Sequence, residues 1–196
     1  MVNAFNNEQD IKDRLSFLNG LDQYSLSNRL EDANLEVQTL VGNKVEEELR
    51  ADRREQSEYT LSFNSVHKVL RIDWRDEQID PENYEIKENP HEPVKIIFDE
   101  ETAKDFQTSK WRPVIEYIPE QFKTLELKLA CKDIVLDSSV QTHDDERKAQ
   151  VEQYEKSIQR LVKSINRSTV NLGSKDRGKT VASNYNFRGD KHRRYG

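Results

Sequence analysis

The sequence predicts a mainly α-helical α+β fold: a four-helix body with a β-strand insert between the second and third helices, and an extended C-terminal arm. Apolar residues recur at steps of three and four over four separate segments, which is the helical period. Between the second and third segments the pattern changes to the alternation of strands. Beyond residue 166 neither period continues and the charge changes sign. The predicted boundaries are therefore 1–166 for the body, 57–117 for the insert within it, and 167–196 for the arm.

Two helices are predicted in the first 54 residues. The first spans 7–20, because Asn7 can cap its start, acidic residues favour that end and Gly20 can stop it. The second begins after Ser25, a further candidate cap. Gly42 interrupts it or bends it, and the helical spacing then resumes to about residue 54.

The insert is predicted to hold five strands. They cover 59–63, 69–74, 84–87, 94–98 and 111–118. Pro113 lies inside the last one, which favours an edge position or a strand that starts after the proline. The acidic run 99–101 predicts a turn after the fourth strand. Trp74 and Trp111 are expected to anchor a core or an interface.

Two long helices are predicted after the insert. Pro119 suits a helix start, because its ring fixes φ and it lacks a donor that the first turn cannot use. Residues 119–137 are apolar around most of the helix, which indicates a central helix about 28 Å long. Residues 144–166 carry a single apolar stripe, which indicates a helix lying on one surface. Cys131 lies among apolar residues and is expected to be buried rather than nucleophilic.

The sequence gives little support to an enzyme. The four histidines lie far apart and none has metal-ligand spacing with another or with Cys131; they are His67, His91, His143 and His192. No glycine-rich phosphate loop is present. We therefore expect no catalytic residues, no metal and no cofactor. Without a run of eighteen apolar residues, no membrane span is expected either.

Charge divides the chain unevenly. Residues 1–166 carry a net charge of −12, whereas 167–196 carry +6 and four of the six glycines. The basic residues of the arm are interleaved with aromatic ones, and the side chains expected to matter most are Arg177, Lys179, Tyr185, Phe187, Arg188, Arg193, Arg194 and Tyr195. This mixture suits docking on an acidic protein surface, contact with nucleic acid, or a solvated end that only aids solubility.

The order of the elements resembles the head–tail connector adaptor proteins of tailed bacteriophages and related archaeal viruses. The segments that carry the resemblance are 69–74, 80–86, 94–98, 114–123 and 125–130, within a match over roughly 7–165. In that family a β segment ending in a V-x-Y pattern leads through a proline to a helix with a lysine and an alanine-rich face. Here Tyr117 is followed by Ile118 and Pro119, without the family's usual glycine.

The resemblance implies a structural virion protein. Such adaptors form a ring of twelve copies that joins the portal to the tail or neck components and extends the DNA channel for genome packaging, retention and ejection. The implied partners are the portal protein, neighbouring adaptor subunits, a stopper or tail-completion protein, and DNA in the channel. The implied location is the head–tail neck of the virion, after assembly in the host cytoplasm.

Under this interpretation residues 167–196 are the portal-docking arm. The alternative is a nucleic-acid-associated protein with an acidic helical body and a basic DNA-binding tail. A third interpretation is a host regulatory or scaffolding protein with a disordered end.

Overall fold

The computed structural model describes residues 4–16, 21, 25–49, 57–89, 92–108, 112–137 and 144–174. Within them the helices are α1 (Glu8–Arg14), α2 (Leu26–Val41), α3 (Glu100–Thr108), α4 (Glu120–Leu136) and α5 (Asp144–Ser174). The strands are β1 (Val45–Glu48), β2 (Glu58–Thr60), β3 (Val66–Trp74), β4 (Glu77–Gln78), β5 (Tyr84–Asn89), β6 (Glu92–Phe98) and β7 (Val114–Pro119). A 3-10 helix, η2 (Pro81–Asn83), precedes β5.

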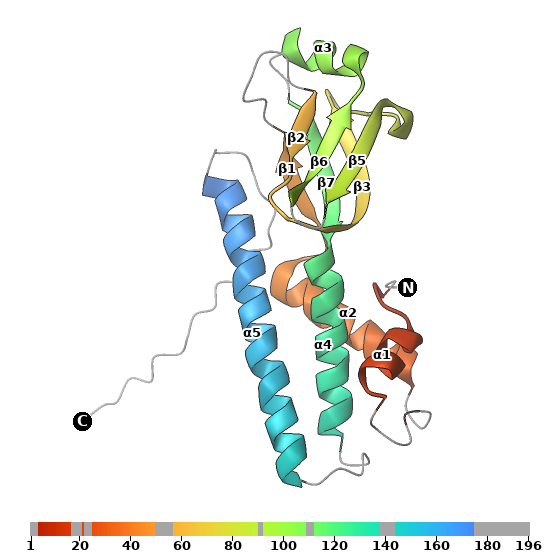
Figure 1. Cartoon of the computed structure of the whole chain (residues 1–196), viewed down its shortest axis with the longest axis vertical. Helices are drawn as coiled ribbons and strands as arrows, with labels where there is room; N and C mark the ends of the chain where they lie inside the picture. Colours follow the sequence, from red (N-terminus) through yellow and green to blue (C-terminus); the bar gives the residue numbers. More distant parts are fainter. Residues whose placement is uncertain are drawn as a thin grey trace, which may run out of the picture.

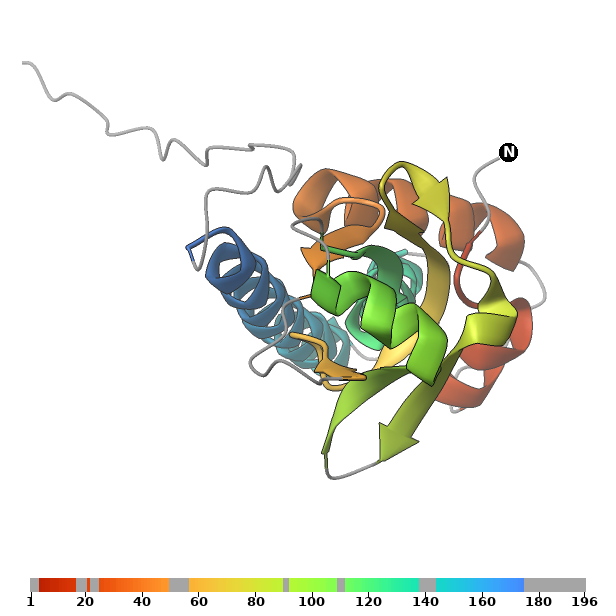
Figure 2. The ribbon, with the colours of Figure 1, turned by 90° about the horizontal axis from the view of Figure 1, so that it is seen from above.

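The described residues form an elongated molecule with a helical lobe and a β lobe (Figure 1). α1, α2, α4 and α5 make the helical lobe, while α3 covers the far end of the β lobe (Figures 1 and 2). The predicted four-helix body with a β insert is wrong. The described part of the chain is an α+β fold with five helices and seven strands, which form one four-stranded and one three-stranded antiparallel sheet. The strands are not an insert in a helical body, because they form a second lobe that buries apolar side chains of its own.

Two sheets build the β lobe. One has the order β1-β7-β3-β4 and the other the order β2-β6-β5, with every pair antiparallel. Strand β6 forms where the sequence predicted a strand, at 94–98, and Val94, Ile96 and Phe98 are buried while their neighbours are more exposed. The ring of Phe98 meets Tyr59 and Phe106 edge-on, at centroid distances of 5.5 and 4.8 Å. The β lobe therefore has an aromatic core beneath α3.

Strand β7 corrects one expectation and confirms another. It starts at Val114, directly after Pro113, so the late start allowed by the proline is confirmed. The edge position is wrong, because β7 pairs with β1 on one side and β3 on the other. Pro113 stays outside the ladder, and its carbonyl oxygen accepts a 2.8 Å hydrogen bond from the amide of Leu49.

The second predicted helix ends earlier than expected. Gly42 has φ +91° and ψ −179°, a conformation that is largely restricted to glycine. The chain therefore turns there, and Val45 pairs with Tyr117 as the first residue of β1. Strand pairing has overridden the helical spacing that the sequence shows after residue 44.

Helix α3 replaces the turn predicted at 99–101. Asp99 caps it, because its Oδ1 accepts from the amide of Thr102 at 2.7 Å and its Oδ2 accepts from the Thr102 hydroxyl at 3.0 Å. Ala103 and Phe106 are buried beneath the helix. Two apolar residues three positions apart on one face were too weak a pattern to predict it.

Helix α4 follows β7 without a loop. Pro119 is the last residue of β7 and the N-cap of α4. The sequence predicted it as the first helical residue, so the helix begins one residue later than expected, at Glu120. The amide of Glu120 donates to the carbonyl oxygen of Ser65 at 3.2 Å, which ties the start of α4 to the β lobe. The predicted central helix is confirmed, since its buried residues are Phe122, Leu125, Glu126, Leu129, Ala130, Cys131, Ile134 and Val135.

Glu126 is a buried carboxylate at the centre of the helical lobe. Its Oε1 accepts from the amide and the side-chain nitrogen of Asn6, at 2.8 and 2.9 Å. Its Oε2 accepts from the Phe5 amide at 2.9 Å and from the side chain of Asn34 at 2.5 Å. These four bonds join the segment before α1, helix α2 and helix α4 around one side chain.

The first and last helices keep their predicted starts but not their ends. Asn7 caps α1 in a capping box with Asp10, as its residue type indicated. The helix ends at Arg14, short of the predicted 7–20. At the other end of the chain α5 continues to Ser174, past the predicted end at 166. The first part of the basic segment is therefore helical.

Candidate functional site

The eight side chains predicted for the docking arm lie outside the described residues. The described chain ends at Ser174, and each of Arg177, Lys179, Tyr185, Phe187, Arg188, Arg193, Arg194 and Tyr195 follows it. Arg167 is the one basic side chain of 167–196 that the structure describes, and it is exposed on α5. The arm therefore remains a prediction, and the described residues must be searched for other sites.

The described residues offer little catalytic chemistry. No group of three or more His, Cys, Asp or Glu side chains among them could hold a metal ion. Cys131 is fully buried, as predicted, and burial raises the pKa of its thiol to about 11. A thiol in that state is a poor nucleophile near neutral pH. His67 lies 3.6 Å from Glu120 at the join of the two lobes.

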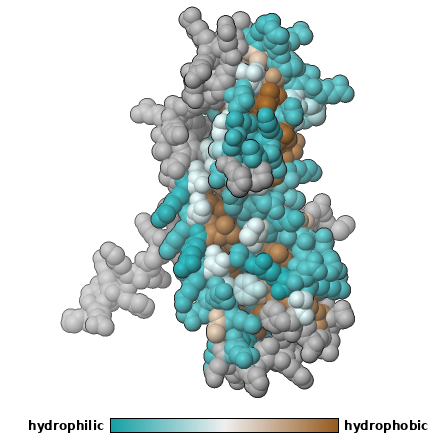
Figure 3. Space-filling model, viewed as in Figure 1, coloured by the Kyte–Doolittle hydropathy of each residue, from teal (hydrophilic) through white to brown (hydrophobic). Residues whose placement is uncertain are grey.

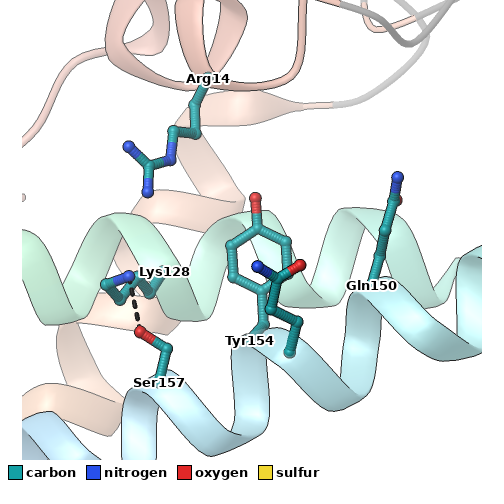
Figure 4. A pocket seen from close by; sticks show the side chains of 6 residues that line it. Arg14, Lys128, Gln150, Tyr154 and Ser157 are labelled. Atoms are coloured by element: carbon teal, nitrogen blue, oxygen red, sulfur yellow. Dashed lines mark hydrogen bonds between the residues drawn. The ribbon is translucent and has the colours of Figure 1, made fainter.

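A pocket of about 210 Å³ opens between α1, α4 and α5. Figure 4 shows how three helices contribute to it: Arg14 reaches in from the end of α1, Lys128 from α4, and Tyr154 from α5. The Nζ of Lys128 donates a 2.8 Å hydrogen bond to the Ser157 hydroxyl oxygen. Gln150 and Gln153 complete the lining. Among the described residues, those that line the pocket are cations, hydroxyl-bearing residues and amides, and none is a carboxylate.

The positive charge of the pocket is not neutralised. Neither Arg14 nor Lys128 lies within 4.0 Å of a carboxylate in the part of the chain that the structure describes. Burial lowers the pKa of Lys128, and the nearby Arg14 guanidinium lowers it further. Burial raises the pKa of the Tyr154 phenol, so this hydroxyl remains protonated and able to donate. The pocket therefore presents donors and positive charge on a predominantly acidic body.

A second cluster of charges lies on the four-stranded sheet. Glu116, on the central strand β7, accepts 2.8 Å bonds from Lys44 and from Arg71 at the same oxygen. Burial alone would raise the pKa of Glu116, but these two cations outweigh it and hold that pKa below its ordinary value. Glu46 and Asp73 balance the remaining charge at 3.3 and 3.0 Å from those cations. This cluster is internally satisfied and stabilises the sheet rather than offering a binding site.

No pattern in the sequence indicates the pocket. Its residues come from the last turn of one helix and the middles of two others, and their types are common on helix surfaces. The helical stripe of 144–166 could at most have placed Tyr154 on the face of α5 that packs on the body. That packing face is confirmed, because Tyr154 is half-buried and Ile158 and Ile165 are buried.

No protein-family model matches the chain, and a search among curated proteins found no match. None of the helices in the described ranges is long and apolar enough to cross a membrane.

Proposed function

We propose that this protein is a non-enzymatic adaptor of a virion neck, whose copies join the portal to the tail machinery. The order of elements supports this role, because it is the order on which the family resemblance rests. Helices α1 and α2 come first, the strands follow, β7 leads through Pro119 into α4, and the long α5 comes last.

The observation that carries the proposal is the overhang of α5. At 1.5 Å per residue, its 31 residues span about 46 Å, whereas the 17 residues of α4 span about 26 Å. The last buried side chain described on α5 is Ile165. Figure 1 shows the end of the helix rising beside the β lobe, past the start of α4. The helix thus carries the start of the basic segment to the outside of the body.

Charge favours a protein surface as the partner of that segment. Residues 175–196 hold seven basic and two acidic side chains, and the body before 167 is strongly acidic. Complementary charge steers association, while aromatic side chains supply the anchoring contacts of many interfaces. We expect the arm to dock on the portal through Tyr185, Phe187 and Tyr195, with its arginines and lysines guiding it.

Assembly into a ring would multiply a weak contact. Neighbouring subunits in a closed ring meet through different faces, so one copy's surface contacts another part of the next copy. With twelve copies, arms of modest individual affinity act together. The hydrophilic surface in Figure 3, with apolar residues showing in bands, suits a protein that meets partners through polar faces.

The test is loading onto the portal ring of the same virus, followed by native mass spectrometry. Full-length protein should bind as a multi-copy ring, whereas protein ending at Ser174 should keep the circular dichroism of the full chain and fail to load. Normal loading of the shortened protein would show that the arm is not the docking element.

Two arm variants separate protein docking from DNA binding. Replacing Tyr185, Phe187 and Tyr195 by alanine should abolish portal loading, while replacing five basic residues by glutamine should slow it and reduce its salt dependence. The five are Arg177, Lys179, Arg188, Arg193 and Arg194. If the unmodified protein instead ignores the portal and binds DNA with a steep salt dependence, the nucleic-acid interpretation is correct.

A further inference from the structure

The pocket between α1, α4 and α5 combines four kinds of donor around one space. Arg14 carries a fork of guanidinium N–H groups, and Lys128 has two ammonium protons left after its bond to Ser157. Tyr154 and Ser157 add hydroxyl groups. Figure 4 shows these side chains coming from three helices, with Lys128 and Ser157 turned toward each other. A group that accepts hydrogen bonds in several directions would satisfy them together.

The missing partner must be negative. The two cations reinforce each other's positive potential, and no carboxylate in the described part of the chain reaches either one. Some cations of the molecule are paired with carboxylates, among them Lys44 with Glu116, Lys95 with Glu58 and Arg29 with Asp137. Arg14 and Lys128 instead bring two positive charges to one pocket, on a body of net charge −12.

The pocket is large enough for a small oxyanion. Its volume is about 210 Å³, which accommodates a carboxylate or a phosphate together with the atoms that attach it.

We propose that this pocket is an oxyanion-binding site, in which a carboxylate or phosphate group sits between Arg14 and Lys128. The guanidinium binds two oxygens side by side, the ammonium neutralises the opposite side, and the hydroxyls of Tyr154 and Ser157 fix the orientation. Two sources can supply such a group: a free anion such as inorganic phosphate, or an acidic side chain on another copy of this chain. The site does not depend on the adaptor role, since failure to load on a portal leaves its geometry unchanged.

The first experiment titrates the full-length protein with sodium phosphate by isothermal calorimetry, at constant ionic strength. Binding should be saturable with one site per chain. Arg14→Gln and Lys128→Gln should each weaken it about ten-fold or more, as expected for loss of one charge-assisted hydrogen bond. Arg14→Lys should weaken it less than Arg14→Gln does, because lysine keeps the charge and loses only the paired N–H groups of the guanidinium.

The matched control is Lys156→Gln, which makes the same substitution as Lys128→Gln on α5, a neighbouring helix that also contributes to the pocket. Lys156 pairs with Glu152 at 2.6 Å and does not line the pocket. This variant should bind phosphate as the unmodified protein does. Absence of saturable binding, or equal weakening by Lys156→Gln and Lys128→Gln, would overturn the proposal. Equal losses in Arg14→Gln and Arg14→Lys would also overturn it, because charge would then not be what the site recognises.

A second measurement identifies the source of the anion. Sedimentation of the full-length protein over a range of concentrations should show self-association that phosphate reverses, if an acidic side chain of another copy occupies the pocket. Arg14→Gln and Lys128→Gln should then remain monomeric. A protein that stays monomeric while it binds phosphate has a free anion as its ligand.

Discussion

Replacing Glu126 by glutamine tests whether one buried carboxylate holds the helical lobe together. Each carboxylate oxygen accepts two hydrogen bonds, from Asn6 at Oε1 and from Phe5 and Asn34 at Oε2. Glutamine keeps one oxygen and presents an amide N–H₂ in place of the other. Two of the four donors then lose their acceptor, whichever way the amide is turned.

The expected loss follows from that count. A buried donor left without an acceptor costs about 1–3 kcal/mol, so the two donors lost in Glu126→Gln should lower the free energy of unfolding by about 2–6 kcal/mol. For a chain of this length each kcal/mol lowers Tm by about 2–4 °C. Urea unfolding followed by circular dichroism measures the global effect. Hydrogen exchange at the amides of Phe5 and Asn6 measures the local one, because both N–H groups donate to Glu126.

Two controls keep the interpretation specific. Glu155→Gln makes the same chemical change at an exposed position of α5 and should alter stability by less than about 0.5 kcal/mol. Asn34→Ala removes one donor, so its effect should shrink in the Glu126→Gln background. A loss of less than about 0.5 kcal/mol in Glu126→Gln, with both amides still protected, would refute the role assigned to this carboxylate.

Three further changes probe other parts of the fold. The cation partners of Glu116 hold its pKa below the ordinary value of about 4.3, so its contribution to the free energy of unfolding is present above that pH and is lost as the pH falls through the lower pKa of the folded state. Glu116→Gln should therefore lose less stability than the unmodified protein does as the pH falls below about 4.3, when urea unfolding is measured at a series of pH values. Identical curves of stability against pH for the two proteins would contradict this. Gly42→Ala should lower the free energy of unfolding by about 1–3 kcal/mol. The cause would be backbone strain alone, because the Cβ of the alanine would meet its nearest neighbouring atom at 3.9 Å and would not clash. An unchanged urea midpoint would argue against the strain. Ile165→Ala should cost about 2–4 kcal/mol and speed hydrogen exchange over the last turns of α5, whereas an exposed change such as Lys163→Ala should do neither.

The sequence predictions were most accurate for elements whose structure depends mainly on their own residues. Residues 119–137 and the start of the helix at 144 carry a helical period long enough to be unambiguous, and both form helices as expected. Residues 94–98 likewise form a strand as predicted. The cap at Asn7 was readable because a side chain of the right type precedes acidic residues.

The failures share a physical cause, since each depends on a partner distant in the chain. Val45 has helical spacing with its neighbours, but pairing with Tyr117 recruits it into a strand. Strand β4 has two residues and exists because the chain reverses at Arg75 and Asp76, both with positive φ. The pocket is a further case, because Arg14 and Lys128 are 114 positions apart and meet only when α1 packs beside α4.

The direct passage of β7 into α4 leaves no loop at this join of the two lobes. A loop at this position would act as a hinge, but Pro119 is buried, fixes the backbone angle and pairs opposite Val66 in the sheet. We therefore expect β7 and α4 to move as one unit, so that a force applied to the β lobe reaches the helical lobe through α4. In the ring proposed above, such a subunit would carry a load from one end to the other instead of bending in the middle.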